Sequence, residues 1–139
     1  MPDMPDTLRL LQIREFGGGT EREQAFVMLY GKENLRDTTC LSEFFARGGI
    51  EIIQATNLRT PETYKAFVER LLTLGEPGVS VETIAGQDVV LCDGEHKREA
   101  YFIADGVLYE VVGGRGVLMG TVRGIIASMA EQLPSSRVK

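Results

Sequence analysis

The sequence predicts an α+β fold in which two or three helices pack on one face of a twisted, mostly antiparallel sheet. Short strand-like segments joined by glycine-containing turns indicate the sheet, and helical apolar stripes interrupt them without regular βαβ alternation. The 139 residues, 43% hydrophobic and 25% charged, have the size and composition of one globular domain. We therefore expect one domain over residues 7–133, between a flexible leader (1–6) and a flexible tail (134–139).

The N-terminal third predicts three strands and one short helix. Apolar residues 8–16 and 25–30, separated by a glycine-rich polar stretch, indicate two strands joined by a flexible loop. Thr38 and Thr39 can cap a short helix that the Gly48-Gly49 pair ends. Residues 50–55 contain three isoleucines and predict a strand.

A longer helix follows, with a clear beginning and end. Thr60 is a suitable N-cap residue, Pro61 suits the first helical position, and Gly75 and Pro77 end the pattern. Its apolar positions fall on one helical face: Tyr64, Phe67, Val68, Leu71 and Leu72.

From Val79 the apolar period becomes two, which predicts a run of antiparallel strands. We expect a turn at residues 86–88, a polar loop over residues 93–98, and a tight hairpin at Asp105-Gly106. A final helix is indicated by an apolar stripe that Pro134 terminates: Leu118, Val122, Ile125, Ile126, Met129 and Leu133.

Charge and hydropathy exclude several classes of partner. The 15 Lys and Arg residues against 20 Asp and Glu residues give a net charge of −5, without a basic patch for nucleic acid. The apolar run of residues 117–129 is too short to span a bilayer. The acidic N-terminus lacks the features of a secretory signal, so we expect a cytoplasmic protein, or an extracytoplasmic one if the chain is an excised domain.

Two glycine patterns near the C-terminus allow more than one interpretation. The stretch Gly113-Gly114-Arg115-Gly116 could bind phosphate at a helix start, but no second βα unit follows, so a plain connection is the preferred interpretation. Gly116, Gly120, Gly124 and Ser128 are four residues apart. We expect them to allow close packing of the helix onto the sheet, and a self-association groove is the alternative.

The cysteines and the single histidine are the remaining chemical candidates. Cys40 and Cys92 have no metal-binding or redox spacing, so we expect free, buried thiols, with a disulfide as the alternative in an oxidising compartment. A small enzyme could use Cys92 as nucleophile with His96 nearby. His96 lies in a polar loop that supplies no convergent ligands, so we predict no catalytic residue, no metal and no cofactor.

The C-terminal half resembles a known family. Residues 81–87 form a strand and turn with a glycine, residues 100–112 form a hairpin with a Tyr-containing second strand, and an amphipathic helix ends at residues 125–129. This pattern, mainly residues 79–133, resembles the DUF4367-type domains, small extracytoplasmic modules of bacterial lipoproteins and proteins related to anti-sigma factors. The resemblance implies a non-catalytic sensing or binding role and supplies no functional residues.

The sequence thus favours a non-enzymatic binding or regulatory domain whose partner is a protein or a small ligand. Two alternatives stay open: a small enzyme that uses Cys92 and His96, and a structural protein that dimerises through its glycine-lined helix.

Overall fold

The computed structural model describes residues 9–17, 24–36, 38, 40–56, 61–114 and 116–133. The expected leader (1–6), the expected tail (134–139) and the predicted N-cap Thr60 lie outside these residues. The described strands are β1 (Arg9–Gly17), β2 (Gln24–Gly31), β3 (Ile50–Thr56), β4 (Val79–Ile84), β5 (Gln87–Asp93), β6 (Lys97–Ala104) and β7 (Val107–Gly114). The described helices are the 3-10 turn η1 (Glu33–Leu35), α1 (Leu41–Ala46), α2 (Pro61–Leu74) and α3 (Met119–Gln132).

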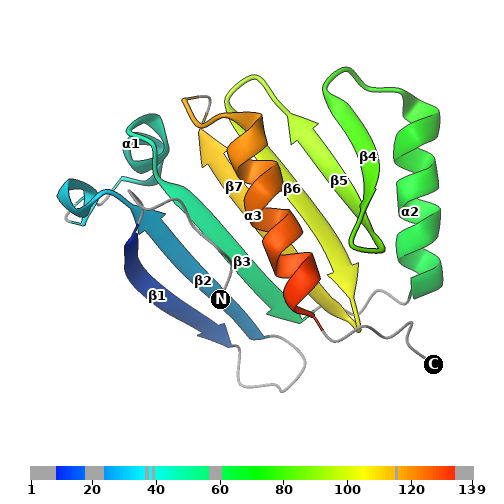
Figure 1. Ribbon diagram of the computed structural model, residues 1–139, viewed down its shortest axis with the longest axis horizontal. Helices are drawn as coiled ribbons and strands as arrows, with labels where there is room; N and C mark the ends of the chain where they lie inside the picture. The colour runs from blue at the N-terminus through cyan, green and yellow to red at the C-terminus, as the bar shows by residue number, and fades with distance from the viewer. Residues whose placement is uncertain are drawn as a thin grey trace.

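All seven described strands form one antiparallel sheet in the order β1-β2-β3-β7-β6-β5-β4. Two meanders, one at each end of the chain, meet where β3 pairs with β7, with Ile52 opposite Val111 (Figure 1). The predicted α+β class, with a mostly antiparallel sheet in a single domain, is confirmed.

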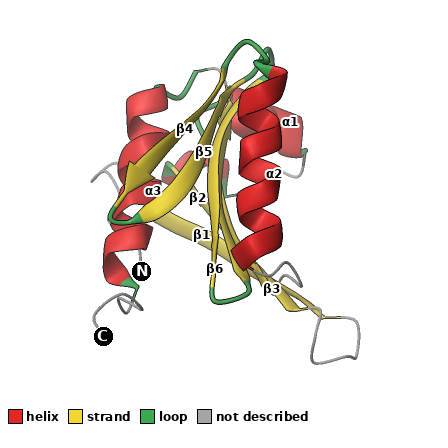
Figure 2. Cartoon of the chain, turned by 90° about the vertical axis from the view of Figure 1, so that its right-hand side faces the viewer, coloured by secondary structure: helices red, strands yellow, loops and turns green. Residues whose placement is uncertain are grey.

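The helices cover both faces of the sheet (Figure 2). Side chains alternate along β6: Ala100 and Phe102 belong to the core under α3, whereas Tyr101 and Ile103 pack toward α2. The short helix α1 packs on the same face as α2, against Leu29 of β2. The expectation that helices pack on one face therefore holds for α1 and α2 and is corrected for α3. Both faces of β5 and β6 are apolar, so a helix must pack on each face to exclude water from it.

The turns depend on residues that accept positive φ. Asp105 (φ 51°) and Gly106 (φ 76°) form the predicted tight hairpin between β6 and β7. The hairpin between β4 and β5 turns at Ala85 (φ 47°) and Gly86 (φ 79°), earlier than the predicted residues 86–88. The predicted loop over residues 93–98 is also shorter, because Asp93 ends β5 and β6 begins at Lys97. The pairing of β6 with β7 includes Lys97 and Arg98, polar residues that the sequence pattern predicts to lie in a loop.

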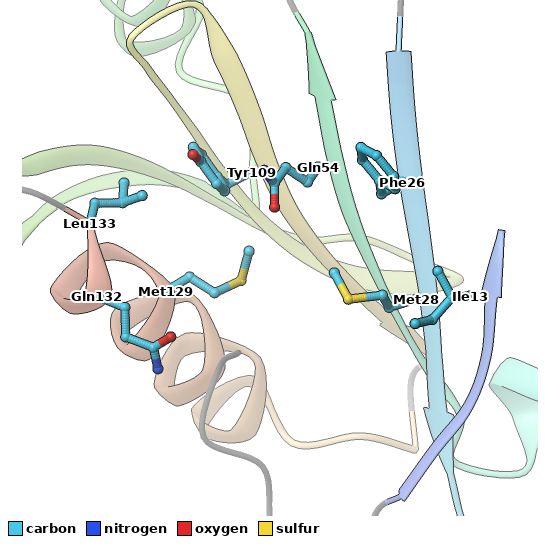
Figure 3. Close-up of a pocket in the computed structure, with 8 residues that line it drawn as sticks. All are labelled: Ile13, Phe26, Met28, Gln54, Tyr109, Met129, Gln132 and Leu133. Atoms are coloured by element: carbon cyan, nitrogen blue, oxygen red, sulfur yellow. The ribbon is translucent and has the colours of Figure 1, made fainter. Parts of the chain in front are cut away.

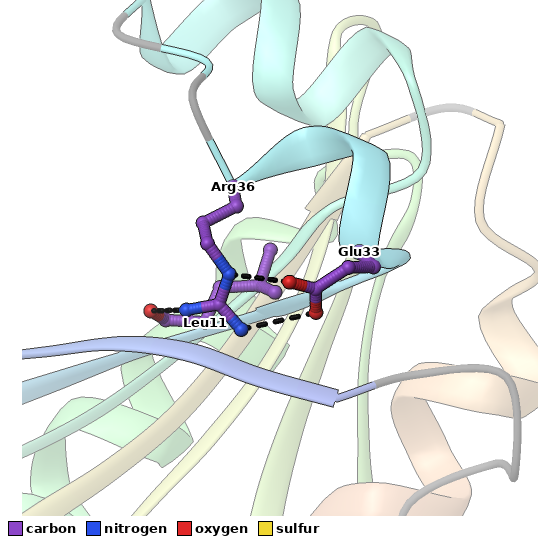
Figure 4. Close-up of polar contacts among 3 residues, drawn as sticks. All are labelled: Leu11, Glu33 and Arg36. Atoms are coloured by element: carbon purple, nitrogen blue, oxygen red, sulfur yellow. Dashed lines mark hydrogen bonds and ion pairs between the residues drawn. The ribbon is translucent and has the colours of Figure 1, made fainter.

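The segment between β2 and β3 holds two short helical elements. Helix α1 starts after Cys40, which is its N-cap residue, so the predicted capping by Thr38 is wrong. Thr39, the other predicted capping residue, lies outside the described residues. The turn η1 is tied to β1 by Arg36, whose guanidinium contacts the Glu33 carboxylate at 2.6 and 3.0 Å and donates to the Leu11 carbonyl at 3.3 Å (Figure 4).

Among the described residues, no helix combines the length and the apolarity needed to cross a membrane. Helix α3 is the most enclosed helix, because its Val122, Ile125 and Ile126 are 0–2% exposed. This helix covers β5, β6 and β7, and no described helix covers the same face of β1 and β2. The surface is therefore recessed between the C-terminal end of α3 and strands β1 and β2, and this recess is called the step below.

Candidate functional site

A pocket of about 600 Å³ occupies this step, between the C-terminal end of α3 and the open sheet face (Figure 3). Its floor is formed by residues of β1, β2, β3 and β7: Ile13, Phe26, Met28, Gln54 and Tyr109. Its wall is formed by the end of α3: Met129, Gln132 and Leu133.

Strand register explains why these floor residues converge. Phe26 of β2 lies opposite Gln54 of β3, which lies opposite Tyr109 of β7. Tyr109 in turn stacks on buried Phe102, with ring centroids 5.1 Å apart. Paired residues point to the same side of a sheet, so the row presents an aromatic, an amide and a phenol next to one another. Through the contact of Tyr109 with Phe102, the pocket floor is continuous with the hydrophobic core.

The outer part of the pocket is open and apolar. Ile13 is 56% exposed and Phe26 is 38% exposed, although both are large hydrophobic residues on a sheet. Met28 of β2 and Met129 of α3 face the space between sheet and helix (Figure 3). Methionine side chains are flexible and adapt their shape to what they contact. Exposed apolar area of this kind, in a concave site, is typical of binding.

Among the described lining residues, the polar side chains are Gln54, Tyr109 and Gln132, and all three are neutral. The Gln132 amide donates to the Ser128 hydroxyl at 3.0 Å, which orients it within α3. Burial, and then the charge of Asp105, raises the pKa of the Tyr109 phenol, so the hydroxyl keeps its proton at neutral pH. Together with Gln54, these groups can orient a bound molecule without supplying a charge.

The opposite face of the sheet carries three glutamates on neighbouring central strands. Glu51 of β3 lies opposite Val112 of β7, and Glu99 of β6 lies on the other side of that valine. Burial, followed by a hydrogen bond and charge repulsion from Glu99, raises the pKa of Glu110 to about 7. Burial also raises the pKa of Glu51. Among the described residues, no group of three or more His, Cys, Asp or Glu residues is arranged to hold a metal ion.

The structure places Cys92 and His96 in different environments. Cys92 is half-buried on the α2 face of β5, and burial, then the charges of Glu99 and Glu110, raise the pKa of its thiol to about 11. His96 is exposed in the short β5–β6 connection. A nucleophilic cysteine needs a lowered pKa, so this environment disfavours the required thiolate.

Both cysteines are free, as expected, but only Cys92 is partly enclosed. Cys40 is exposed, so its predicted burial is wrong. A hydrogen bond from the Ser42 side chain, followed by backbone hydrogen bonds, lowers the pKa of the Cys40 thiol.

The glycines near the C-terminus serve different purposes. A Cβ atom at Gly114 would lie 2.5 Å from the Phe45 carbonyl oxygen, so this glycine lets α1 approach β7. A Cβ atom at Gly113 would lie 3.1 Å from the Cβ atom of Val117, a looser contact than that at Gly114 but still a tight one, which supports a structural connection at this loop. Gly120 and Gly124, in contrast, face open space. The expectation that they allow close packing of α3 onto the sheet is therefore wrong.

Comparison with protein-family models, with curated proteins and with solved structures finds no match for this chain. The resemblance of residues 79–133 to the DUF4367-type domains stays a prediction.

Sequence reasoning did not find the pocket. The sequence predicts a helical stripe with Met129 and Leu133, and strands with Ile13 and residues 25–30, but no local pattern places these elements together. These apolar residues carry no local signal of a pocket, because the same patterns are typical of residues that face a core. Their convergence depends on the β3–β7 pairing, which joins the two meanders.

Proposed function

We propose that this chain is a non-catalytic binding domain that holds a small apolar molecule in the pocket between α3 and the sheet. The observation that carries the proposal is a concave space of about 600 Å³, lined mainly by exposed or half-buried hydrophobic residues. Small-molecule sites usually enclose about 300–1,000 Å³ and combine apolar walls with a few polar groups. A binding role is also what the resemblance to the DUF4367-type domains implies.

The enzyme alternative receives less support. The raised pKa of Cys92 and the exposed position of His96 leave that pair without an activated nucleophile. The dimerising alternative has Gly120 and Gly124 on an open side of α3, but a row of small residues is not by itself an interface. Binding in the pocket therefore stands as the proposed function.

A titration with 1-aminoanthracene, a neutral fluorescent probe of apolar sites, tests this proposal. The native chain should bind one probe molecule, and Ile13→Lys should weaken binding about tenfold or more by placing an ammonium at the pocket mouth. Leu72→Lys is a matched control. Leu72 lies on α2, which covers the opposite face of the sheet, and its exposed fraction of 58% is close to the 56% of Ile13.

Leu72→Lys should bind the probe as the native chain does. Circular dichroism of both variants should match that of the native chain, since each replaced side chain is already more than half exposed. The proposal is overturned if the native chain does not bind the probe, or if Ile13→Lys binds it with unchanged affinity.

A further inference from the structure

The described residues that line the pocket include no charged side chain. Three of them are polar, and all three are neutral: Gln54, Tyr109 and Gln132. A charged group that leaves water needs an opposite charge or several hydrogen bonds to compensate for lost hydration. An apolar ligand with an ionised head group would find no such counter-charge among these side chains.

The polar groups lie toward β3, β7 and the end of α3, where Met129 and Leu133 also lie, whereas the described residues toward β1 and β2 are apolar. Gln54 and Tyr109 are directly opposite each other across the β3–β7 pair, and Gln132 extends from the end of α3. Ile13 and Met28 lie at the other end of the pocket from Gln132 (Figure 3). A bound molecule with one polar end and one apolar end would therefore have a preferred orientation, with its apolar part toward β1 and β2.

The surrounding charge also acts against an anion. Asp105, in the β6–β7 turn, contributes a negative charge that Tyr109 experiences. The whole chain has a net charge of −5. An anionic ligand would be repelled on approach, and none of the described lining residues is a cation that would offset this repulsion once it is bound. A cationic ligand would be attracted on approach, but Asp105 is not among the described lining residues, so the bound cation would still lose its hydration without an ion pair.

From these observations we infer that the pocket selects an uncharged amphiphile: an elongated apolar molecule that carries a hydroxyl or an amide group rather than a carboxylate, phosphate or ammonium. This inference rests on the proposed function and narrows its ligand class. The ligand hydroxyl or amide would exchange hydrogen bonds with the Gln54 amide and the Tyr109 phenol, both of which can donate and accept.

Displacement of 1-aminoanthracene by three ligands of equal chain length tests this inference: 1-decanol, decanoate and decylammonium, all at pH 8. Each is used below the concentration at which it self-associates. We expect 1-decanol to displace the probe at a concentration at least about tenfold lower than either ion, because each ion would lose hydration without a counter-charge. Equal or tighter binding of decanoate or decylammonium overturns the inference.

The two failures are distinguishable. If 1-aminoanthracene binds and Ile13→Lys weakens it, the pocket is a binding site whatever the ranking of the three ligands. If the probe does not bind at all, the proposed function fails and the inference fails with it.

A variant pair tests the polar end. Gln54→Leu should weaken 1-decanol about three- to tenfold, the value of one neutral hydrogen bond. Gln12→Leu makes the same chemical change at an exposed position of β1, opposite Leu29, outside the pocket, and should leave binding unchanged. Unchanged 1-decanol affinity in Gln54→Leu, with unchanged circular dichroism, contradicts the assignment of Gln54 as the polar contact.

Discussion

Glu99 and Glu110 lie diagonally across the β6–β7 pair, and their side chains share a hydrogen bond. A hydrogen bond between two carboxyl groups needs one proton, so the pair is stable with one negative charge and strained with two. Lys97 lies near Glu99, with its nitrogen 3.7 Å from the carboxylate, and partly offsets that charge. The third glutamate of this face, Glu51, adds to the negative charge that Glu110 experiences.

This pair predicts that stability falls as pH rises toward and through 7. The folded pKa of Glu110, about 7, lies above its ordinary value of 4.5, so between these values the folded state holds a proton that the unfolded state releases. The native chain should lose about 1–2 kcal/mol of unfolding free energy between pH 5 and pH 8, after allowance for partial exposure. Urea unfolding at several pH values measures this loss.

Glu110→Gln should remove most of that pH dependence, because glutamine stays neutral throughout. Exposed Glu62→Gln on α2 is the control and should retain the native profile. A native unfolding free energy that rises from pH 5 to pH 8 relative to Glu110→Gln would contradict the prediction.

Two Gly→Ala substitutions should have opposite effects on stability. Gly124→Ala places a methyl group in open space on α3 and should stabilise the fold by about 0.5–1 kcal/mol through helix propensity. Gly114→Ala places the same group 2.5 Å from the Phe45 carbonyl oxygen and should destabilise it by about 1–3 kcal/mol. Thermal unfolding compares the two variants.

The same glycine variant tests self-association. If the glycine side of α3 is a dimer interface, the native chain has twice its monomer mass in light scattering and Gly124→Ala reduces it. We expect a monomer mass for both chains, and a native dimer that Gly124→Ala dissociates would favour the structural alternative.

The two cysteines should differ in reactivity. Cys40 is exposed with a lowered pKa, whereas the thiol of Cys92 has a pKa of about 11. Iodoacetamide at pH 7.5 should therefore modify Cys40 about tenfold faster or more, which mass spectrometry of the Cys40→Ser and Cys92→Ser variants can follow. Faster modification of Cys92 would revive the enzyme alternative.

Helix α2 should depend on one hydrogen bond at its first turns. The Tyr64 hydroxyl donates to the Asp88 carbonyl at 2.7 Å, which joins α2 to the beginning of β5. Tyr64→Phe should cost about 1 kcal/mol of unfolding free energy, since this hydrogen bond to the Asp88 carbonyl is lost. Thr73→Ala removes an exposed hydroxyl bonded within α2 and should change stability by less. Equal stability of Tyr64→Phe and the native chain would show that this bond does not hold α2.

Local patterns in the sequence were enough for most of the elements. The Asp105-Gly106 turn was predictable because few residue pairs accept positive φ at both positions. Helix α2 was predictable from Pro61 and one apolar face. The errors came where local signals compete, as at Lys97 and Arg98, which are polar residues that strand pairing nevertheless holds in β6.

The sequence by itself determined the class of the fold, the antiparallel meanders and the absence of a recognisable catalytic motif, because these depend on neighbours along the chain. The pairing of β3 with β7, the placement of α3 opposite α2, the Glu99–Glu110 contact and the pocket were decided only by the tertiary structure. Backbone hydrogen bonds are chemically the same at every residue. Neighbouring residues in the sequence therefore do not indicate which distant strands pair. Ile13 and Met129, 116 positions apart in the sequence, line one pocket because that pairing joins the two halves of the sheet.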